Sequence, residues 1–290
     1  MGLVLRRNGA FGLRRRPAGG SQGLVPFSAF QLTRGTEASR RVVPNGSQIE
    51  FVGVNVKRFE DLNDGYGQLL LVEDAATNLA VDPEDPQAWS LTNSSTGATG
   101  LVAPDGDPDA DVIVMDPIGN ARAMASLSPT PTDNAQHAAS VYRLLTTGSS
   151  TTLETRVETK AGSLINPPSP VSSTLWMRAG IEYDMGTGAT TPAAGVEAAD
   201  SLGSSFAVWG LQVEENAWPT SYVRSGTRDP DTVILPASQV PPWLTSGAFA
   251  IVCAPRFSSA EYGSVTAPGN RAILSVGSAT TDSIYIAPVG

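Results

Sequence analysis

The chain has 290 residues, of which 41% are hydrophobic and 16% are charged, and its formal net charge is −9. That length is sufficient for a buried core, and no apolar run approaches the ~20 residues of a membrane-spanning helix. One cysteine, Cys253, and one histidine, His137, exclude an intramolecular disulfide and a zinc site made of Cys and His. The 29 glycines and 22 prolines predict many turns between short strands.

The first 30 residues form a basic arm. Residues 1–41 hold eight arginines and one glutamate, a charge of +7, whereas the remainder carries −16. There is no apolar stretch of a signal peptide, and Arg6 stands where a myristoylation motif needs Ser or Thr. We expect an extended arm that docks on a partner protein rather than on nucleic acid, with a solvated terminus as the alternative. The docking residues predicted are Arg6, Arg7, Arg14, Arg15 and Arg16.

Residues 31–87 form a separate small block. Pro44-Asn45-Gly46 is a hairpin-type turn between two extended pieces, and residues 68–72 form a short apolar strand. A loop rich in Asp and Pro follows. We expect a β-hairpin connector.

Residues 88–225 carry several short β-type runs separated by turn residues, the spacing of an all-β sandwich. TTLETRVETK (151–160) and LQVEE (211–215) alternate as strands with one wet face do. HAASVYRLLT (137–146) fits a short helix by periodicity as well as a strand. Residues 226–290 add four more strand-like runs, too few for a complete second sandwich. We therefore expect a partial domain and a natural chain that continues beyond Gly290.

Five segments in a fixed order resemble a family of bacteriophage virion proteins, the tail-fibre, head-fibre and related appendage proteins. Trp209 to Glu214 match its WGAQLE signature, with Leu211 and Val213 as small apolar departures, and Trp218-Pro219 replaces a small residue in the following turn. The segments are TRGTEAS (33–39), LLVEDAATNLA (70–80), AW (88–89), APDGD (103–107) and AVWGLQVEENAWPTSYVRSGTR (207–228).

The resemblance implies a jelly-roll β-sandwich similar to carbohydrate-binding modules, with an extended N-terminal arm before it and the start of a laminin-G or concanavalin-like sandwich after it. It implies a structural component of the phage particle, assembled in the host cytoplasm. Anchored by its N-terminus to tail, neck or portal proteins, it would attach to host-surface glycans, as a homotrimer. A purely structural neck or baseplate connector and a glycan-degrading enzyme remain the alternatives.

The stretch AVWGLQVEE predicts the last strand of the sandwich. By alternation, Trp209, Leu211 and Val213 face the core, and Glu214 and its alternating neighbours face away. Gly210 allows a neighbouring backbone or ring to approach closely.

One loop offers a metal site. Asp105, Asp107, Asp109 and Asp111 place carboxylates at alternate positions, and calcium prefers such oxygen ligands. The downstream glutamate of an EF-hand is missing, and Asp-Gly and Asp-Pro pairs are also ordinary turn formers. Calcium is the only cofactor that the sequence suggests.

Two aromatic residues are predicted to contact a glycan, Trp218 in a turn beside Pro219, and Tyr222. Trp218 suits a domain interface equally well. Trp176 and Trp209, at strand positions, are expected in the core.

No catalytic residue is predicted. The acids Glu154, Glu158, Glu182 and Asp184 lie on expected strands, but nothing in the sequence pairs them as glycoside hydrolysis requires. His137 stands alone in a plain polar segment, so no nucleophile-histidine arrangement is indicated.

Overall fold

The computed structural model describes residues 2–6, 12–14, 31–42, 48–61, 68–73, 75–198, 203–216, 219–234, 238 and 250–252. Most of the expected arm and most of the expected second sandwich lie outside these residues. The part of the chain that is described holds no helix long and apolar enough to cross a bilayer.

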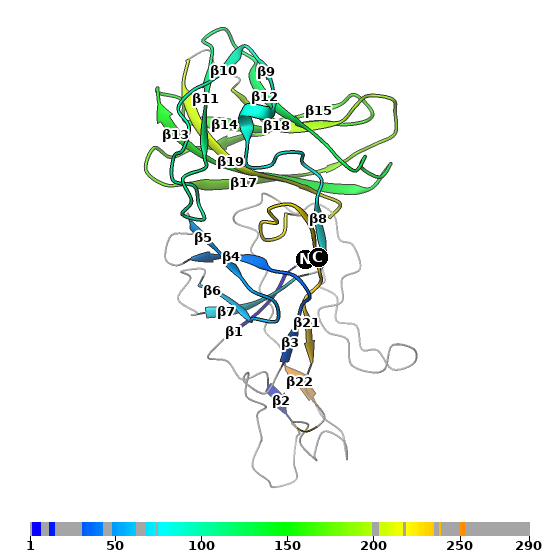
Figure 1. Cartoon of the computed structure of the whole chain (residues 1–290). Coiled ribbons are helices and arrows are strands. Elements are labelled where there is room, and N and C mark those ends of the chain that lie inside the picture. Colours follow the sequence, from blue (N-terminus) through cyan, green and yellow to red (C-terminus); the bar gives the residue numbers. More distant parts are fainter. Residues whose placement is uncertain are drawn as a thin grey trace.

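The described chain is a two-layer β-sandwich set on a smaller group of strands (Figure 1). The sheet nearer that group, here the proximal sheet, consists of β10 (Ser94–Thr96), β11 (Asp111–Met115), β19 (Ser205–Glu214), β13 (Gln136–Thr147) and β17 (Met177–Asp184), in this order. The other, the distal sheet, consists of β15 (Leu164–Ile165), β14 (Thr152–Glu158), β18 (Ala193–Ala198), β12 (Ala121–Ser126) and β9 (Ser90–Thr92), and β16 (Pro168–Pro170) also pairs with β14.

All strand pairs of the sandwich are antiparallel, and most neighbours are distant in sequence. This is the crossing pattern of a jelly roll, so the predicted all-β jelly-roll class is confirmed. The segment HAASVYRLLT lies in the 12-residue strand β13 and not in a helix. Pairing with β17 on one edge and β19 on the other decides this, because both neighbours supply ladder hydrogen bonds.

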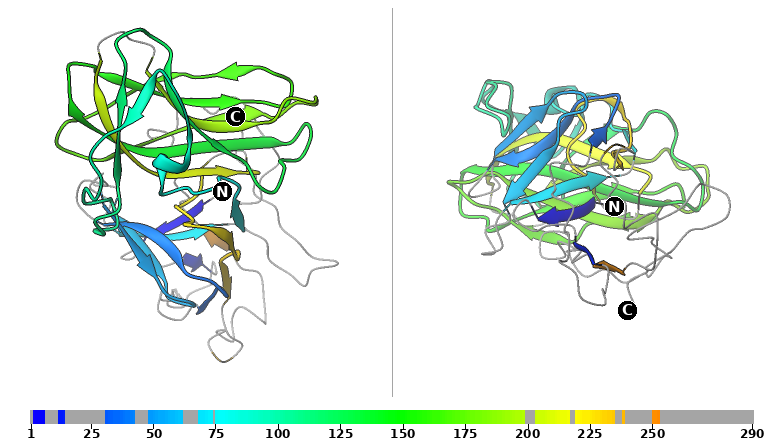
Figure 2. Two further views of the ribbon diagram at one scale, coloured as in Figure 1. Left: turned by 45° about the horizontal axis from the view of Figure 1, so that its top comes forward. Right: turned by 90° about the horizontal axis from the view of Figure 1, so that it is seen from below.

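The smaller group of strands, here the basal block, lies beside the proximal sheet, as the turned views of Figure 2 also show. Within it, the two strands that flank Pro44-Asn45-Gly46 pair as a hairpin, as predicted, although the turn lies outside the described residues. Its strands are β1 (Gly2–Arg6), β2 (Gly12–Arg14), β3 (Gln31–Thr33), β4 (Ala38–Val42), β5 (Gln48–Val52), β6 (Arg58–Asp61), β7 (Gln68–Glu73), β8 (Ala76–Asn78), β20 (Gly226–Arg228), β21 (Thr232–Ile234) and β22 (Ala250–Val252).

The basal block draws strands from both ends of the described chain. Strand β20 pairs with β8, β21 pairs with β3, and β22 pairs with β2. The strands that follow the sandwich therefore complete sheets begun before it.

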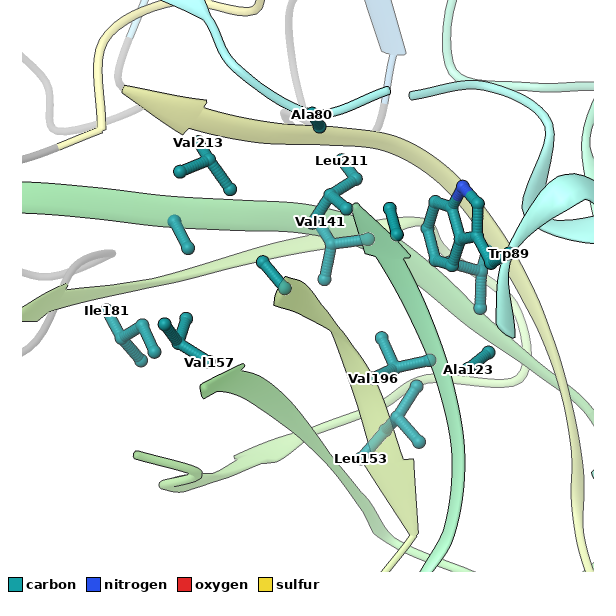
Figure 3. Close-up of a cluster of buried hydrophobic side chains, with 14 of the residues drawn as sticks. Ala80, Trp89, Ala123, Val141, Leu153, Val157, Ile181, Val196, Leu211 and Val213 are labelled. Atoms are coloured by element: carbon teal, nitrogen blue, oxygen red, sulfur yellow. The ribbon is translucent and has the colours of Figure 1, made fainter. Parts of the chain in front are cut away.

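The main core lies between the two sheets (Figure 3). The distal sheet contributes mostly alanines, such as Ala123, and the proximal sheet contributes larger side chains such as Phe206 and Leu211. Small residues facing large ones allow the layers to interdigitate. A single-turn 3-10 helix, η2 (Pro86–Ala88), delivers Trp89 to the edge of this core, where its indole N–H donates to the Asp82 carbonyl at 2.8 Å.

A β-bulge at Gly210 changes which side chains face this core. Strand β13 advances two residues from Ser140 to Tyr142 while β19 advances three, from Gln212 to Trp209. Gly210 has φ +64°, a conformation that glycine adopts without strain. The prediction that Trp209 shares a face with Leu211 is therefore wrong. Trp209 is fully buried on the outer face of the proximal sheet instead.

Candidate functional site

The outer face of the proximal sheet is covered by the segment that follows β19, here the return segment (residues 219–225). The Glu214 carboxylate accepts hydrogen bonds from the Thr220 backbone N–H at 2.6 Å and from its hydroxyl at 2.9 Å. The Gln212 side-chain carbonyl accepts from the Val223 N–H at 2.7 Å. Gln212 and Glu214 are therefore almost completely buried, and the expectation that this face is wet is wrong.

Aromatic rings fill the centre of this covered face. Tyr222 lies against Trp209, with ring centroids 4.8 Å apart, and edge-on to Tyr142 at 6.3 Å. A Cβ at Gly210 would lie 3.2 Å from atoms of both Tyr142 and Tyr222, so the close approach predicted for this glycine is confirmed. Tyr222 is 1% exposed and its hydroxyl donates to Glu84 at 2.9 Å. Its ring offers no face to a surface ligand, which corrects its assignment as a glycan contact.

Below the return segment, a buried charged network joins it to the basal block. Glu73 of β7 accepts hydrogen bonds from Arg58 at 2.8 Å and from Arg228 at 2.5 Å. It also accepts from the Ser221 N–H at 2.7 Å and from the Ser221 hydroxyl at 2.5 Å. Burial alone would raise the pKa of Glu73, but Arg228, Arg58 and these hydrogen bonds outweigh burial and hold that pKa far below its usual range.

Asp231 extends the network to the first strands of the block. It pairs with Arg58 and, at 2.8 Å, with Arg34, and all three side chains are fully buried. Arg34 also donates to the Gly53 carbonyl at 2.9 Å. Three of the five sequence segments that carry the family resemblance, 33–39, 70–80 and 207–228, thus meet at one junction, and their shared role here is to hold the sandwich on the basal block.

Asn78, in the segment LLVEDAATNLA (70–80), completes the junction. Its side-chain N–H groups donate to the carbonyls of Leu211 and Val223, both at 2.9 Å, and its side-chain oxygen accepts from the Val213 N–H at 3.1 Å. One amide therefore ties β8 to β19 and to the return segment.

The predicted calcium ligands are only partly brought together. Oxygens of Asp105, Asp107 and Asp109 lie within 4.8 Å of one another. Arg224 already faces them, 2.5 Å from Asp105 and 3.9 Å from Asp107. Asp111 is not part of this group, because its buried carboxylate accepts from Gln87 at 2.9 Å.

Arg224 competes with a metal ion for this acidic loop, because its guanidinium already pairs with Asp105. Burial, followed by the neighbouring Asp105, raises the pKa of Asp109. Arg224 also pairs with Glu84 at 2.9 Å, so the loop is joined to the loop before η2.

The outer face of the distal sheet carries a second charged group, here the distal cluster. In the strand register, Arg122 lies opposite Glu197, and Glu197 lies opposite Glu154. Side chains on adjacent strands at the same level of one face contact each other. The cluster comprises Arg122, Glu154, Arg156, Glu158, Asn166 and Glu197.

Hydrogen bonds link five of these six side chains, and an ion pair joins Arg122 to Glu158. Arg156 pairs with Glu197 and donates to Glu158 at 3.1 Å. The Asn166 amide donates to Glu154 at 2.7 Å and to Glu197 at 3.2 Å.

Exposure divides the distal cluster into a fixed floor and an accessible rim. The side chains of Arg156 and Glu197 are 5% and 2% exposed, whereas those of Arg122 and Glu158 are 33% and 27% exposed. Arg122 and Glu158 face each other at 3.6 Å, a loose pair compared with the buried ones. The buried side chains are here the floor, and the partly exposed pair of Arg122 and Glu158 is the rim. The rim is therefore the part that a ligand can reach.

The sequence identified Glu154 and Glu158 but missed the other four members. Glu197 stands in the otherwise apolar run AAGVEAA, and a lone charge in such a run is the signal that could have found it. The structure pairs Glu154 with Glu197 through Asn166, whereas Glu182 and Asp184 lie on β17 of the other sheet.

Other predicted residues take varied positions. Trp218 and the docking arginines Arg7, Arg15 and Arg16 lie outside the described residues, and Arg6 and Arg14 are the last residues of β1 and β2. Trp176, expected in the core, is only partly buried, and its indole N–H donates to the Val102 carbonyl at 3.0 Å.

No protein-family model matches the chain, and no curated protein sequence does. Solved structures similar to it include the xylan-binding CBM22-1 domain of Xyn10C from Paenibacillus barcinonensis, at 16% identity and a TM-score of 0.40, covering 51% of this chain and 98% of that one. The CBM22-1-GH10 modules of xylanase 10B from Clostridium thermocellum share 10% identity with a TM-score of 0.41, over 52% and 30% of the two chains. An exo-β-agarase shares 8% identity with a TM-score of 0.39, over 50% and 25%.

Proposed function

We propose that this chain is a structural component of a phage particle, anchored through its N-terminal part, whose sandwich attaches to the host surface. The order of its sequence segments, which resembles that of virion appendage proteins, supports the proposal. The contrast between the two outer faces of the sandwich supports it from the structure.

That contrast carries the proposal. The proximal sheet is held on the basal block by the buried network around Glu73, and the basal block contains the N-terminal strands β1 and β2. The distal sheet lies on the opposite side of the sandwich from the block and bears the distal cluster (Figure 1). An anchor on one side and a polar, partly exposed face on the other suit a protein that links a particle to a surface.

A homotrimer fixed to the particle by its arginine-rich arm would increase attachment. Several weak sites held together bind a surface far more strongly than one does, because later contacts form at a high effective concentration. The arm would dock on tail, neck or portal proteins through its positive charge, which the acidic remainder of the chain lacks.

Antibody labelling of intact particles tests this proposal. An antibody raised against residues 88–198 should decorate protruding fibres in electron micrographs. Label confined to the neck or baseplate would favour the connector role, with the sandwich as a spacer. Particles without any label would overturn the virion assignment.

A further inference from the structure

We propose that the distal cluster is a binding site for neutral glycans, that is, for uncharged polyhydroxylated chains. The inference rests on the proposed attachment function and adds to it the site and the chemical class of ligand. It is built on the strand register, the hydrogen bonds and the charge balance of the cluster.

The register aligns polar side chains in a row across the sheet. Thr92 lies opposite Arg122, Arg122 opposite Glu197, and Glu197 opposite Glu154. Four strands at about 4.8 Å spacing make this row roughly 14 Å long, and it runs across the strands. Thr92 is exposed and Arg122 is partly exposed, whereas Glu197 and Glu154 are buried. A ligand would therefore reach the row at the end formed by Thr92 and Arg122.

The accessible pair of the cluster combines a hydrogen-bond acceptor, Glu158, with a donor, Arg122. Ionised carboxylates only accept hydrogen bonds and guanidinium groups only donate them. A sugar hydroxyl does both, so neighbouring hydroxyls of one ring can donate to Glu158 and accept from Arg122. Arg156 and Asn166 hold the floor in place beneath this rim. A fixed floor lowers the entropy cost of binding.

The charge balance of the cluster selects for an uncharged ligand. Three carboxylates face two guanidinium groups, and Arg156 is already paired with Glu197 and Glu158. An acidic polysaccharide would bring its charge next to an excess of carboxylates and would have to displace Glu158 from Arg122. Like charges at such distances repel strongly where water is partly excluded.

The test uses the full chain on an array of purified bacterial surface polysaccharides with neutral and with acidic repeat units. The rim variant R122Q/E158Q should lose about tenfold in apparent affinity for neutral polymers, the loss expected when hydrogen bonds to charged groups are removed. The second variant, N166A, loosens the floor and should weaken the same binding. The control is R40Q/E50Q, an exposed Arg–Glu ion pair in the basal block, which should bind as the unaltered chain does.

Each other outcome overturns the inference in its own way. Binding to acidic polymers alone would refute the ligand class. Neutral binding that the rim and floor variants leave unchanged would refute the site. No binding to any polymer would refute the whole inference, while antibody label on protruding fibres would leave the proposed function standing.

Discussion

The two outer faces of this sandwich carry similar sequence patterns but differ in what contacts them. On the proximal sheet, Gln212 and Glu214 alternate with apolar residues, and the return segment covers and hydrogen-bonds both. On the distal sheet, Glu154, Arg156 and Glu158 alternate in the same way. Arg156 bonds to Glu158 and Glu197, and Asn166 bonds to Glu154 and Glu197. A polar alternation thus indicates a face that avoids the main core, but it does not indicate whether that face meets water or protein.

The buried polar groups on the two faces also serve different purposes. Around Glu73, charges come from segments up to 197 residues apart, as in the pair of Arg34 and Asp231, so the network joins distant parts of the chain. The distal cluster is drawn from neighbouring strands of one sheet. The network around Glu73 is therefore a joint, that is, a connection between the sandwich and the basal block. The distal cluster belongs to one face of one sheet. Four predictions can break or sharpen this contrast.

The largest effect is expected for Glu73→Gln. It removes the charge that balances Arg58 and Arg228, and breaking a buried ion pair costs about 3–5 kcal/mol of unfolding free energy. Urea denaturation at neutral pH measures it. The control Glu50→Gln, at an exposed pair, should cost less than about 1 kcal/mol. Equal losses in the two variants would show that the junction is not a joint.

A smaller loss, of about 2 kcal/mol, is expected for Gly210→Ala, which combines a left-handed backbone with crowding against Tyr142 and Tyr222. Gly106→Ala separates the two causes, because its φ is +95° but no atom lies within 4 Å of the added Cβ. Thermal unfolding followed by tryptophan fluorescence compares the variants. Gly210→Ala should be the less stable of the two, and the reverse order would contradict the proposed ring packing.

Acid should weaken the joint around Glu73. Because the pKa of Glu73 is depressed in the folded chain, its contribution is fully present above the unfolded pKa of about 4.3 and is lost as the pH falls below that value. The pKa of Glu84, raised by burial, contributes with the opposite sign. The unfolding free energy of the unaltered chain should decrease as the pH is lowered from 7 to 3. Glu73→Gln should flatten that fall, and parallel curves would refute the role of this carboxylate.

The smallest effect on stability is expected for R122Q/E158Q. Its two side chains are about a third exposed and 3.6 Å apart, so the loss should be less than about 1 kcal/mol. Chemical denaturation beside the binding measurements checks this. A loss as large as that of Glu73→Gln would show that the distal rim also holds the fold together.

Much of the fold was predictable from local patterns. Alternation and turn residues indicated the sandwich, and Gly210 beside Trp209 indicated a close ring contact. The glycan and metal predictions were less accurate, because exposure was inferred from residue type. Tyr222 is buried and Asp111 is turned away from the other acids by partners that the local sequence does not reveal.

The sequence by itself determined the strands, the hairpin of the basal block and the separation of a basic arm from an acidic body. These depend on period-two alternation, turn chemistry and charge, which act within a few residues. Only the tertiary structure decided that Trp209 leaves the main core, that Glu214 is covered, and that Glu154 meets Glu197. One extra residue at the Gly210 bulge reverses the facing of a strand, and a buried charge is stable only beside a partner supplied from elsewhere in the chain.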